Sequence, residues 1–181
     1  MGLVPVTSGK IHFESERGKV ELSGLSRRAY RPYRSEIQMV YQDPFSSLNP
    51  RLSVQEIVEE PLKVHQTHMS SEERRLRVEE LLEKVGLRRE QAERYPHEFS
   101  GGQRQRIGIA RSLATNPRVI IADEPVSALD VSIQAQVINL MRSLQRELDL
   151  TIVFIAHDIS VVQHVSDRVA VMYLGNLVEV G

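Results

Sequence analysis

Residues 99–106 read Phe-Ser-Gly-Gly-Gln-Arg-Gln-Arg, and this stretch decides the fold of the chain. A helical repeat of apolar residues follows it and predicts a helix from Ser100 to about Asn116, where Pro117 ends it. Glycines at the start of a helix let a ligand approach the backbone, and the free amides and the helix dipole there favour an anion. The alternative is that Ser100 is only an N-cap and that the glycines form a tight turn.

Apolar runs further along the chain predict a sheet. Residues 118–123 (Arg-Val-Ile-Ile-Ala-Asp) and 151–156 (Thr-Ile-Val-Phe-Ile-Ala) predict strands buried on both faces, and residues 169–174 predict a third strand. A helix is predicted to begin at Asp130, with its apolar face formed by Ile133, Val137, Leu140, Met141, Leu144 and Leu148. This alternation of strand and helix indicates a parallel sheet covered by helices.

Polar residues follow two of these strands. Asp123 and Glu124 end the first, at the edge where ligands gather in a parallel α/β sheet. There an Asp can hold Mg²⁺, directly or through water, and an adjacent Glu can orient or deprotonate a water that attacks a phosphate. His157 follows the next strand and can donate a hydrogen bond to a phosphate oxygen or to that water. Taken singly, Asp123-Glu124 could be a turn and His157 a helix cap.

The first fifty residues read as short strands and a loop. Residues 10–13 and 19–22 predict a hairpin around Gly18, and residues 37–41 predict a further strand. Residues 43–50, Asp-Pro-Phe-Ser-Ser-Leu-Asn-Pro, carry two prolines and several turn-forming residues. They therefore indicate an ordered loop rather than a helix or strand.

The segment from Val54 to Tyr95 has a helical pattern. Ser70 and Glu73 have the spacing of a capping box, and Gly86 is expected to end the helix that they begin. We expect the charged side chains near the start of this helix to form a solvated face: Glu72, Glu73, Arg74, Arg75 and Arg77.

Composition limits the classes of protein to consider. The chain has 181 residues, 41% of them hydrophobic, which suffices for one domain with a real core. A formal net charge of −1 argues against a generally basic nucleic-acid binder. The absence of cysteine excludes a disulfide framework or a thiolate zinc site within these residues.

The order of these signals resembles the nucleotide-binding subunit of ABC transporters. Residues 100–103 match its signature loop, Asp123-Glu124 the end of its Walker B strand, Asp130 its D-loop and His157 its switch histidine. Gln42, directly after the strand predicted at 37–41, matches its Q-loop glutamine. The resemblance runs from about Thr7 onward.

The resemblance implies a role for each of these residues in binding and hydrolysing ATP with Mg²⁺. Glu124, His157 and Gln42 would be catalytic, and Asp123 and Gln42 would hold the metal ion. The remaining matched residues would contact nucleotide: Ser100, Gly101, Gly102, Gln103 and Asp130. In the family two ATPase domains pair head to tail, so the signature loop contacts ATP held mainly by the partner.

Two longer segments narrow the resemblance. Residues 40–51 and 95–106 look like the branch that serves oligopeptide, dipeptide and nickel importers. This branch implies a second ATPase subunit, identical or different, transmembrane permease subunits, and indirectly a solute-binding protein, but no nucleic acid. It also implies a peripheral position on the cytoplasmic face of the plasma membrane, with the loop at 43–50 near the permease.

The implied fold class is α/β: a P-loop-NTPase-like parallel sheet with an α-helical subdomain. Residues 1–42 would be a remnant of the β-rich and core part, residues 43–116 the Q-loop and helical subdomain with the signature, and residues 117–181 the core with Walker B, D-loop and switch histidine. No Gly-x-x-x-x-Gly-Lys-Ser/Thr occurs, so we expect a fragment whose phosphate-loop part, with its helix and a central strand, is missing. Such a fragment should leave the sheet poorly covered and bind ATP weakly or not at all.

Two alternatives belong to other functional classes. The chain could be a non-hydrolytic partner that lends its signature loop to another subunit's ATP site. It could instead be a DNA-repair or ribosome-associated relative with the same signature loop. Against the repair proteins, a compact helical segment rather than a long coiled coil separates Gln42 from Ser100.

Overall fold

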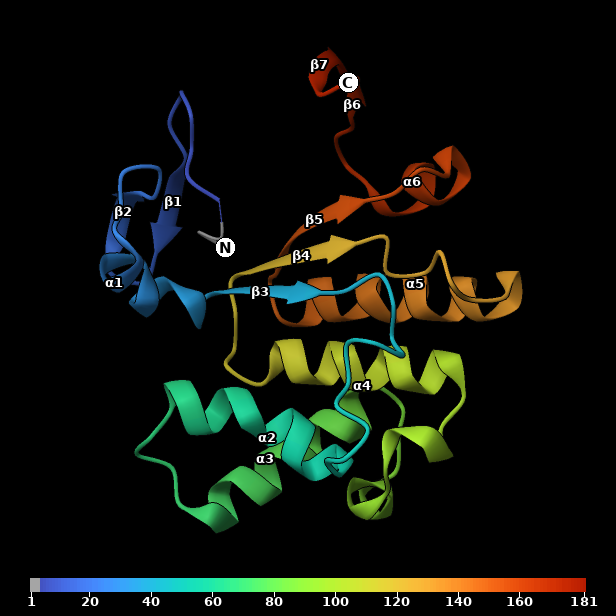
Figure 1. Cartoon of the computed structure of the whole chain (residues 1–181). Coiled ribbons are helices and arrows are strands. Elements are labelled where there is room, and N and C mark those ends of the chain that lie inside the picture. Colours follow the sequence, from blue (N-terminus) through green and yellow to red (C-terminus); the bar gives the residue numbers. More distant parts are fainter. Residues whose placement is uncertain (1–3) are drawn as a thin grey trace.

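A three-stranded parallel sheet forms the centre of the computed structural model, which describes residues 4–181. Its strands are β3 (Ile37–Val40), β4 (Val119–Asp123) and β5 (Thr151–Ile155), in the order β3-β4-β5. Figure 1 shows that the three arrows point the same way, so the carboxyl ends of the strands meet at one edge. The predicted parallel α/β core is confirmed for these strands.

Two helices cover one face of this sheet, α4 (Gly101–Leu113) and α5 (Val131–Glu147), as Figure 1 shows. The α4 helix ends three residues before the predicted Asn116. The core beneath the sheet includes Val40, Ile120 and Ala122 from the strands, Ile107, Ala110 and Leu113 from α4, and Val137, Met141 and Leu144 from α5. The predicted apolar face of α5 is thus largely right, except that it omitted the buried Ile138 and included Leu148, which is exposed.

The opposite face of the sheet is covered only near Ile37, by a small cluster with Leu22 and Tyr30, which contradicts the prediction of strands buried on both faces. In β4, Ile120 and Ala122 are buried, whereas the alternate residues Val119 and Ile121 are only half-buried. In β5, Val153 is 49% exposed and Ile155 46% exposed. Successive side chains of a strand point to opposite faces. One face of each strand is therefore packed on α4 and α5, and the other has little cover.

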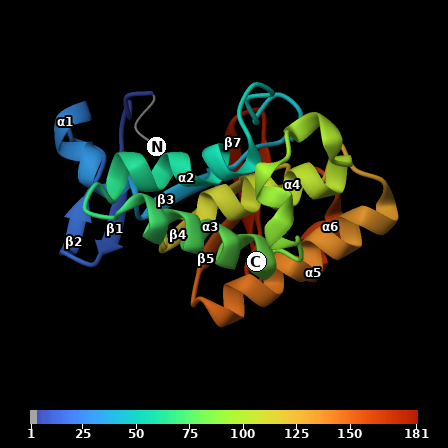
Figure 2. The ribbon, with the colours of Figure 1, turned by 90° about the horizontal axis from the view of Figure 1, so that it is seen from below.

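A separate helical layer lies beyond α4, and Figure 2 shows it from its outer side. It contains α2 (Val54–His65), α3 (Ser71–Lys84) and the short 3₁₀ helices η2 (Arg89–Glu93) and η3 (Pro96–Glu98). The predicted capping box is present, since Ser70 Oγ accepts from Glu73 N while Glu73 Oε2 accepts from Ser70 N. As predicted, the chain leaves α3 at Gly86, whose φ of +75° suits a glycine.

One predicted solvated side chain is in fact part of the packing of this layer. Arg74 Nε donates to Glu59 Oε1 at 2.6 Å, and Glu59 is buried on α2. Burial raises the pKa of Glu59, but hydrogen bonds from Arg74 and Lys63 outweigh burial and hold the pKa below its ordinary value. Arg74 therefore joins α3 to α2, because a buried carboxylate needs a cationic donor.

The N-terminal unit packs on the start of β3 and β4. Its hairpin, β1 (His12–Ser15) with β2 (Gly18–Glu21), is antiparallel and confirms the predicted hairpin. Two short helical turns follow, α1 (Arg27–Tyr30) and η1 (Arg31–Arg34). The buried Glu36 anchors the hairpin turn, since its carboxylate accepts from Ser15 Oγ and from Glu16 N.

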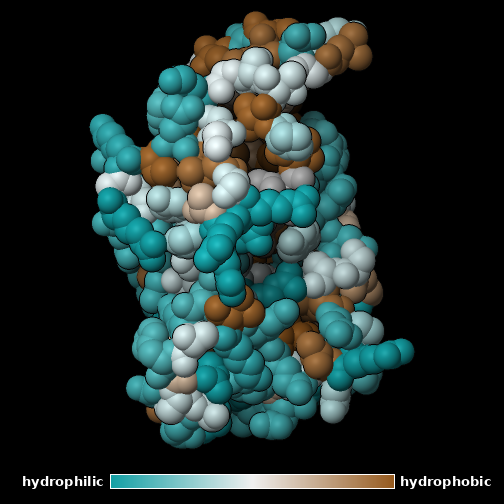
Figure 3. All heavy atoms as spheres, turned by 60° about the vertical axis from the view of Figure 1, so that its left-hand side comes forward, coloured by the Kyte–Doolittle hydropathy of each residue, from teal (hydrophilic) through white to brown (hydrophobic). Residues whose placement is uncertain are grey.

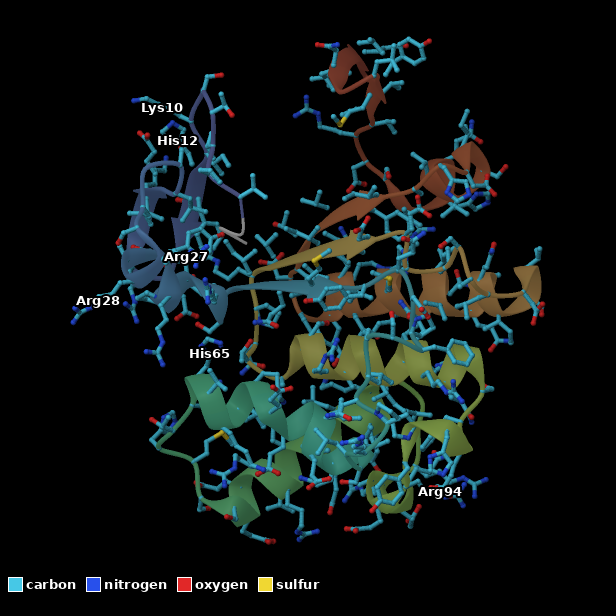
Figure 4. The ribbon with its side chains drawn as sticks, in the orientation of Figure 1. Lys10, His12, Arg27, Arg28, His65 and Arg94 are labelled. Atoms are coloured by element: carbon cyan, nitrogen blue, oxygen red, sulfur yellow. The ribbon has the colours of Figure 1, made fainter. Side chains whose placement is uncertain are left out.

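Basic side chains line the outer edge of this unit. Figure 4 shows Arg28 extending outward from α1, and His65 at the near end of α2. Burial, followed by the positive charges of Arg31 and Arg34, lowers the pKa of His65. Burial and the positive charge of this edge therefore favour the neutral form of His65.

The C-terminal segment differs from the prediction of a third parallel strand. After α6 (Ile159–Val165), β6 (Ala170–Tyr173) pairs antiparallel with β7 (Asn176–Val180) in a separate two-stranded sheet. Leu174 and Gly175, both with positive φ, form the tight turn that favours a hairpin over a crossover. The side chains of this hairpin are exposed, and Figure 3 shows hydrophobic groups gathered at that end of the molecule. No helix within residues 4–181 is both long and apolar enough to cross a membrane.

Candidate functional site

Three predicted catalytic residues meet at the carboxyl edge of the sheet. Gln42 follows β3, Glu124 follows β4 and His157 follows β5. Gln42 Nε2 donates to Glu124 Oε2 at 2.9 Å, and His157 Nδ1 lies 3.2 Å from the same oxygen. Residues separated by 82 and 33 positions in the sequence therefore converge on one carboxylate oxygen, as the parallel topology predicts.

The backbone at Glu124 has a conformation that is uncommon for a residue with a side chain. Its φ is +42°, in the left-handed region, and its N–H donates to Ile155 O at 3.0 Å. The Glu124 carbonyl in turn accepts from the backbone N–H and the hydroxyl of Ser127. These bonds stabilise a strained residue that turns its carboxylate toward Gln42 and His157, and such strain often marks functional sites.

His157 is 72% exposed at its side chain and does not cap the helix that follows. Asp158 caps α6 instead, because its Oδ1 accepts from Ser160 N at 2.8 Å. A cavity of about 60 Å³ lies beside Glu124 and His157, which line it together with Ser127, Gln134 and other residues. The imidazole is thus free to turn toward a ligand at the edge of the sheet.

Asp123 and Gln42 are the expected magnesium ligands. Asp123 is the last residue of β4 and is half-buried. The Gln42 amide nitrogen donates to Glu124, which leaves its oxygen as the end able to coordinate a cation. Within residues 4–181 no group of three His, Asp or Glu side chains could hold a metal ion alone. This donor set fits Mg²⁺, which typically binds one or two carboxylates and completes its shell with water and substrate phosphates.

The predicted signature turn is an N-cap with a capping box, in which each side chain accepts from the backbone N–H of the other residue. Ser100 Oγ accepts from Gln103 N, and Gln103 Oε1 accepts from Ser100 N. A methyl group added at Gly102 would overlap Ile133 of α5, so packing between two helices explains this glycine. A methyl group at Gly101 would meet only Leu129 and Phe45, at 3.4 and 3.9 Å. The N-cap alternative is therefore correct locally, and Gly101 is the less enclosed glycine of the two.

Asp130 is exposed at the start of α5, as predicted. Its side chain makes no capping bond, while its backbone carbonyl accepts from Ile133 and Gln134. Leu129, next to it, is the residue nearest to Gly101. The Asp130 segment thus borders the signature turn.

The structure brings the predicted residues together in two groups rather than one. Gln42, Glu124 and His157 form the first group, and residues 100–103 with Asp130 form the second. Across the described part of the chain, no hydrogen bond or ion pair joins the side chains of the two groups. The two groups are therefore separate in the described part of the chain.

Sequence reasoning missed a set of residues that join these groups. Arg104 and Arg111 of α4 contact the loop that begins with Gln42, and Gln105 donates to the carbonyl of Tyr41 directly before it. The sequence does not distinguish these residues from the other polar residues of the helix, which include Gln103 and Arg106. A second cavity, of about 470 Å³, lies under the same loop and is lined in part by Tyr41, Ser47, Pro61 and Arg111.

Comparisons with known proteins agree with this geometry. The family model described as ABC transporter matches residues 1–127. The oligopeptide transport ATP-binding protein OppF of Escherichia coli strain K12 is 56% identical over 181 residues, which are 100% of this chain and 53% of that protein. The dipeptide transport ATP-binding protein DppF of Lactococcus lactis is 53% identical over 176 residues, 97% of this chain and 55% of that protein.

A solved structure is also similar. The dimeric ATP-binding cassette MJ0796, in a post-hydrolysis state with ADP and Pi, has a TM-score of 0.83 and 32% identity. The alignment covers 99% of this chain and 75% of that chain. This chain spans about half the length of the curated relatives that it matches. The order of its site residues, its fold and these matches together show that the chain belongs to the ABC transporter family.

Proposed function

We propose that this chain is part of the ATP-hydrolysing subunit of an importer for peptides or a similar small solute. The observation that carries the proposal is the convergence of Gln42 and His157 on Glu124 at the carboxyl edge of the sheet. In that position Glu124 would orient or deprotonate the attacking water, and His157 would donate to a phosphate oxygen. Asp123 and the Gln42 amide oxygen would hold Mg²⁺, which neutralises charge on the phosphates when bound.

The signature turn would serve a second subunit. Residues 100–103 lie at the start of a helix of 13 residues, where backbone amides and the helix dipole favour a phosphate. The separation of this turn from the Glu124 group supports ATP held mainly by a partner. The solved MJ0796 cassette is dimeric, which supports the pairing of this chain with a second ATPase subunit. We extend the proposal to Asp130, which would lie at the contact between the two subunits. We also propose that the chain divides after residues 42 and 116, into the three parts given by the sequence analysis.

The loop at 43–50 would contact the membrane subunits at the cytoplasmic face. The side chains of Phe45 in the loop and of Tyr41 shortly before it are exposed, and the 470 Å³ cavity beneath the loop is open to a docking segment. Exposed aromatic side chains beside a cavity are typical of protein interfaces. A solute-binding protein would act through the membrane subunits without touching this chain.

A second candidate function rests on a specific sequence observation. The 181 residues contain no Gly-x-x-x-x-Gly-Lys-Ser/Thr, the loop that cradles the β- and γ-phosphates. The chain could then contribute only its signature turn to another subunit's ATP. Both functions require the turn, whereas only the first requires Glu124.

An ATPase assay in a mixed dimer tests the proposal. The chain is combined with an intact oligopeptide-transport ATP-binding subunit whose own signature glycine has been replaced by Asp. Turnover at the intact subunit's phosphate loop then depends on the turn of this chain. Gly101→Asp should abolish the stimulation, because a carboxylate beside Leu129 and Phe45 would repel the phosphates.

Gly24→Asp is the matched control, since nothing lies within 4 Å of a methyl group added there. It should leave the stimulation unchanged. Equal activity with the Gly101→Asp chain and the unmodified chain would refute the role of the turn. Glu124→Gln separates the two candidates once a phosphate loop is supplied in the same polypeptide, because only the first function then loses turnover.

A further inference from the structure

The loop that carries Gln42 is fastened at both ends by side chains from elsewhere in the fold. At its start, Gln42 Nε2 donates to Glu124. Near its end, Arg111 Nη1 donates to Ser47 O at 2.7 Å. Side-chain hydrogen bonds join residues 42–48 to the rest of the described chain only at these two places. The position of Gln42 therefore depends on α4 as well as on Glu124.

Arg111 is an unusual residue to find in this position. It lies half-buried on a helix whose neighbouring residues Ala110 and Leu113 are core, and its guanidinium stands 5.6 Å from the centre of the Tyr41 ring. Burial lowers the pKa of Arg111. Desolvating a guanidinium is unfavourable, and among residues 4–181 it makes no salt bridge with a carboxylate. The loop carbonyl, the tyrosine ring and the nearby negative charge of Glu60 compensate it.

Arg104 contacts the same loop two helical turns earlier on α4. Its Nε donates to Pro96 O at 2.7 Å, which directs the guanidinium over the Phe45 ring, 4.1 Å from the centroid. Phe45 in turn lies beside Gly101 of the signature turn. Between the two arginines, the buried amide of Gln105 points toward Tyr41 O at 3.4 Å, a long hydrogen bond. Three side chains of one helix thus hold one loop.

We propose that Arg104, Gln105 and Arg111 are positioning residues that clamp residues 41–48 to α4, and that this clamp keeps Gln42 on Glu124. The clamp also makes the loop and the signature turn a single mechanical unit, because Phe45 contacts both Arg104 and the start of α4. A displacement of the loop by a docked partner would then reach Glu124 through Gln42 and the signature turn through Phe45.

If the clamp exists, breaking it at Arg111 releases Gln42, which is more than 60 residues away in the sequence. The importance of the clamp for turnover rests on the proposed function, but the existence of the clamp does not. We therefore test it without ATP, so that a failed clamp leaves the ATPase proposal standing and the reverse also holds. The side-chain amide of Gln42 is the reporter, observed by NMR of the ¹⁵N-labelled 20.6 kDa chain and assigned as the signal that Gln42→Ala removes.

Arg111→Gln should move the Gln42 amide signal toward the position that it takes in Glu124→Ala, where its acceptor is gone. Amide exchange in residues 42–48 should become about tenfold faster, the factor that corresponds to about 1.4 kcal/mol and to the loss of one charge-assisted hydrogen bond. Arg111→Lys keeps a donor for Ser47 O. It should therefore keep the Gln42 amide signal near its original position and amide exchange in residues 42–48 near its original rate.

Arg106→Gln is the matched control. Arg106 is also on α4 and also donates to a backbone carbonyl, Val85 O at 2.7 Å, but it does not touch the loop. It should leave the Gln42 signal and the loop exchange unchanged. A folded Arg111→Gln chain in which the Gln42 signal stays in place would overturn the proposal, as would an equal effect of Arg106→Gln. If Arg111→Gln does not fold, Arg104→Gln and Tyr41→Leu probe the same clamp from its exposed side.

Discussion

Helices α2, α3 and α4 and the segment from Thr151 to Gly181 are buried very differently, although the segment has the more apolar sequence of the two. In the three helices, Leu62, Leu81, Leu82 and Ile107 are completely inaccessible to solvent. In residues 151–181, Val161 alone is buried. The three helices are well covered, because they pack on one another and share one hydrophobic core with the sheet. The last thirty residues have apolar faces and little to pack against.

The two groups of candidate residues therefore lie in regions that differ in packing. Residues 100–103 and the clamp lie on α4, which is well packed. The Glu124 group depends on the ends of β3, β4 and β5, one of which is half-exposed. We therefore expect the turn to tolerate changes in residues 151–181 that disturb His157.

The largest expected effect is the difference in stability between a variant at a buried leucine and one at an exposed leucine. Leu81→Ala should destabilise the chain by about 2–5 kcal/mol, because it leaves a cavity among buried residues. Leu177→Ala, at a side chain that is 60% exposed, should change stability by less than about 0.5 kcal/mol. Urea unfolding followed by far-UV circular dichroism measures both. Similar losses for the two variants would mean that the C-terminal hairpin is packed after all.

A second test concerns the closeness of packing between α4 and α5. Gly102→Ala should cost about 1–3 kcal/mol, because the added methyl group overlaps Ile133. Ile133→Ala in the same chain should recover part of this loss. On the same helix, Gly108→Ala meets no atom within 4 Å and should stabilise by up to about 1 kcal/mol. Thermal unfolding compares the three, and a harmless Gly102→Ala would show that α5 can shift.

Replacing helix caps compares the stability of the two regions through smaller changes in the free energy of unfolding. Ser70→Ala removes one half of a capping box on a 14-residue helix and should cost about 1 kcal/mol. Asp158 caps only the exposed seven-residue α6, so we expect Asp158→Ala to lower the stability by about a few tenths of a kcal/mol. Hydrogen exchange should localise each loss to its own helix. A global loss from Asp158→Ala would contradict the separation of the two regions.

The smallest effect concerns pH at the edge between α2 and the N-terminal unit. The pKa of His65 lies below its ordinary value of 6.5, so the unfolded chain binds the proton more readily than the folded chain. The contribution of His65 to stability is therefore complete above that value and is lost as the pH falls below it. Arg31→Gln should raise the pKa of His65, and NMR titration of the imidazole measures it. An unchanged pKa would show that Arg31 does not act on His65.

Much of this could be predicted from residue order. Strands β3 to β5, the start of α4, and the meeting of Gln42, Glu124 and His157 all follow from the rule that parallel strands end at one edge. Burial could not be predicted in the same way, because an apolar strand such as β5 has the same sequence whether its second face is covered or open. The β6–β7 hairpin was missed because its two-residue turn was read as the end of a strand.

The clamp residues illustrate a further limit of sequence reasoning. Arg104 and Arg111 look like ordinary polar positions on a helix, and only the folded loop shows what they contact. Likewise, Gly101 and Gly102 together predict a ligand-binding turn. In the structure the two differ, because an added methyl group would overlap Ile133 at Gly102 but would overlap nothing at Gly101. Local patterns predict elements well, whereas contacts between distant segments depend on tertiary packing.

The most direct test of the central claim is an ATP titration of the 181-residue chain by isothermal calorimetry in the presence of Mg²⁺. Our account holds that the Glu124 carboxylate and residues 100–103 are in the positions that the proposed function requires, but that the 181 residues contain no loop that cradles the phosphates. It predicts no saturable binding at micromolar ATP and no turnover. Micromolar affinity together with turnover that Glu124→Gln abolishes would contradict the account.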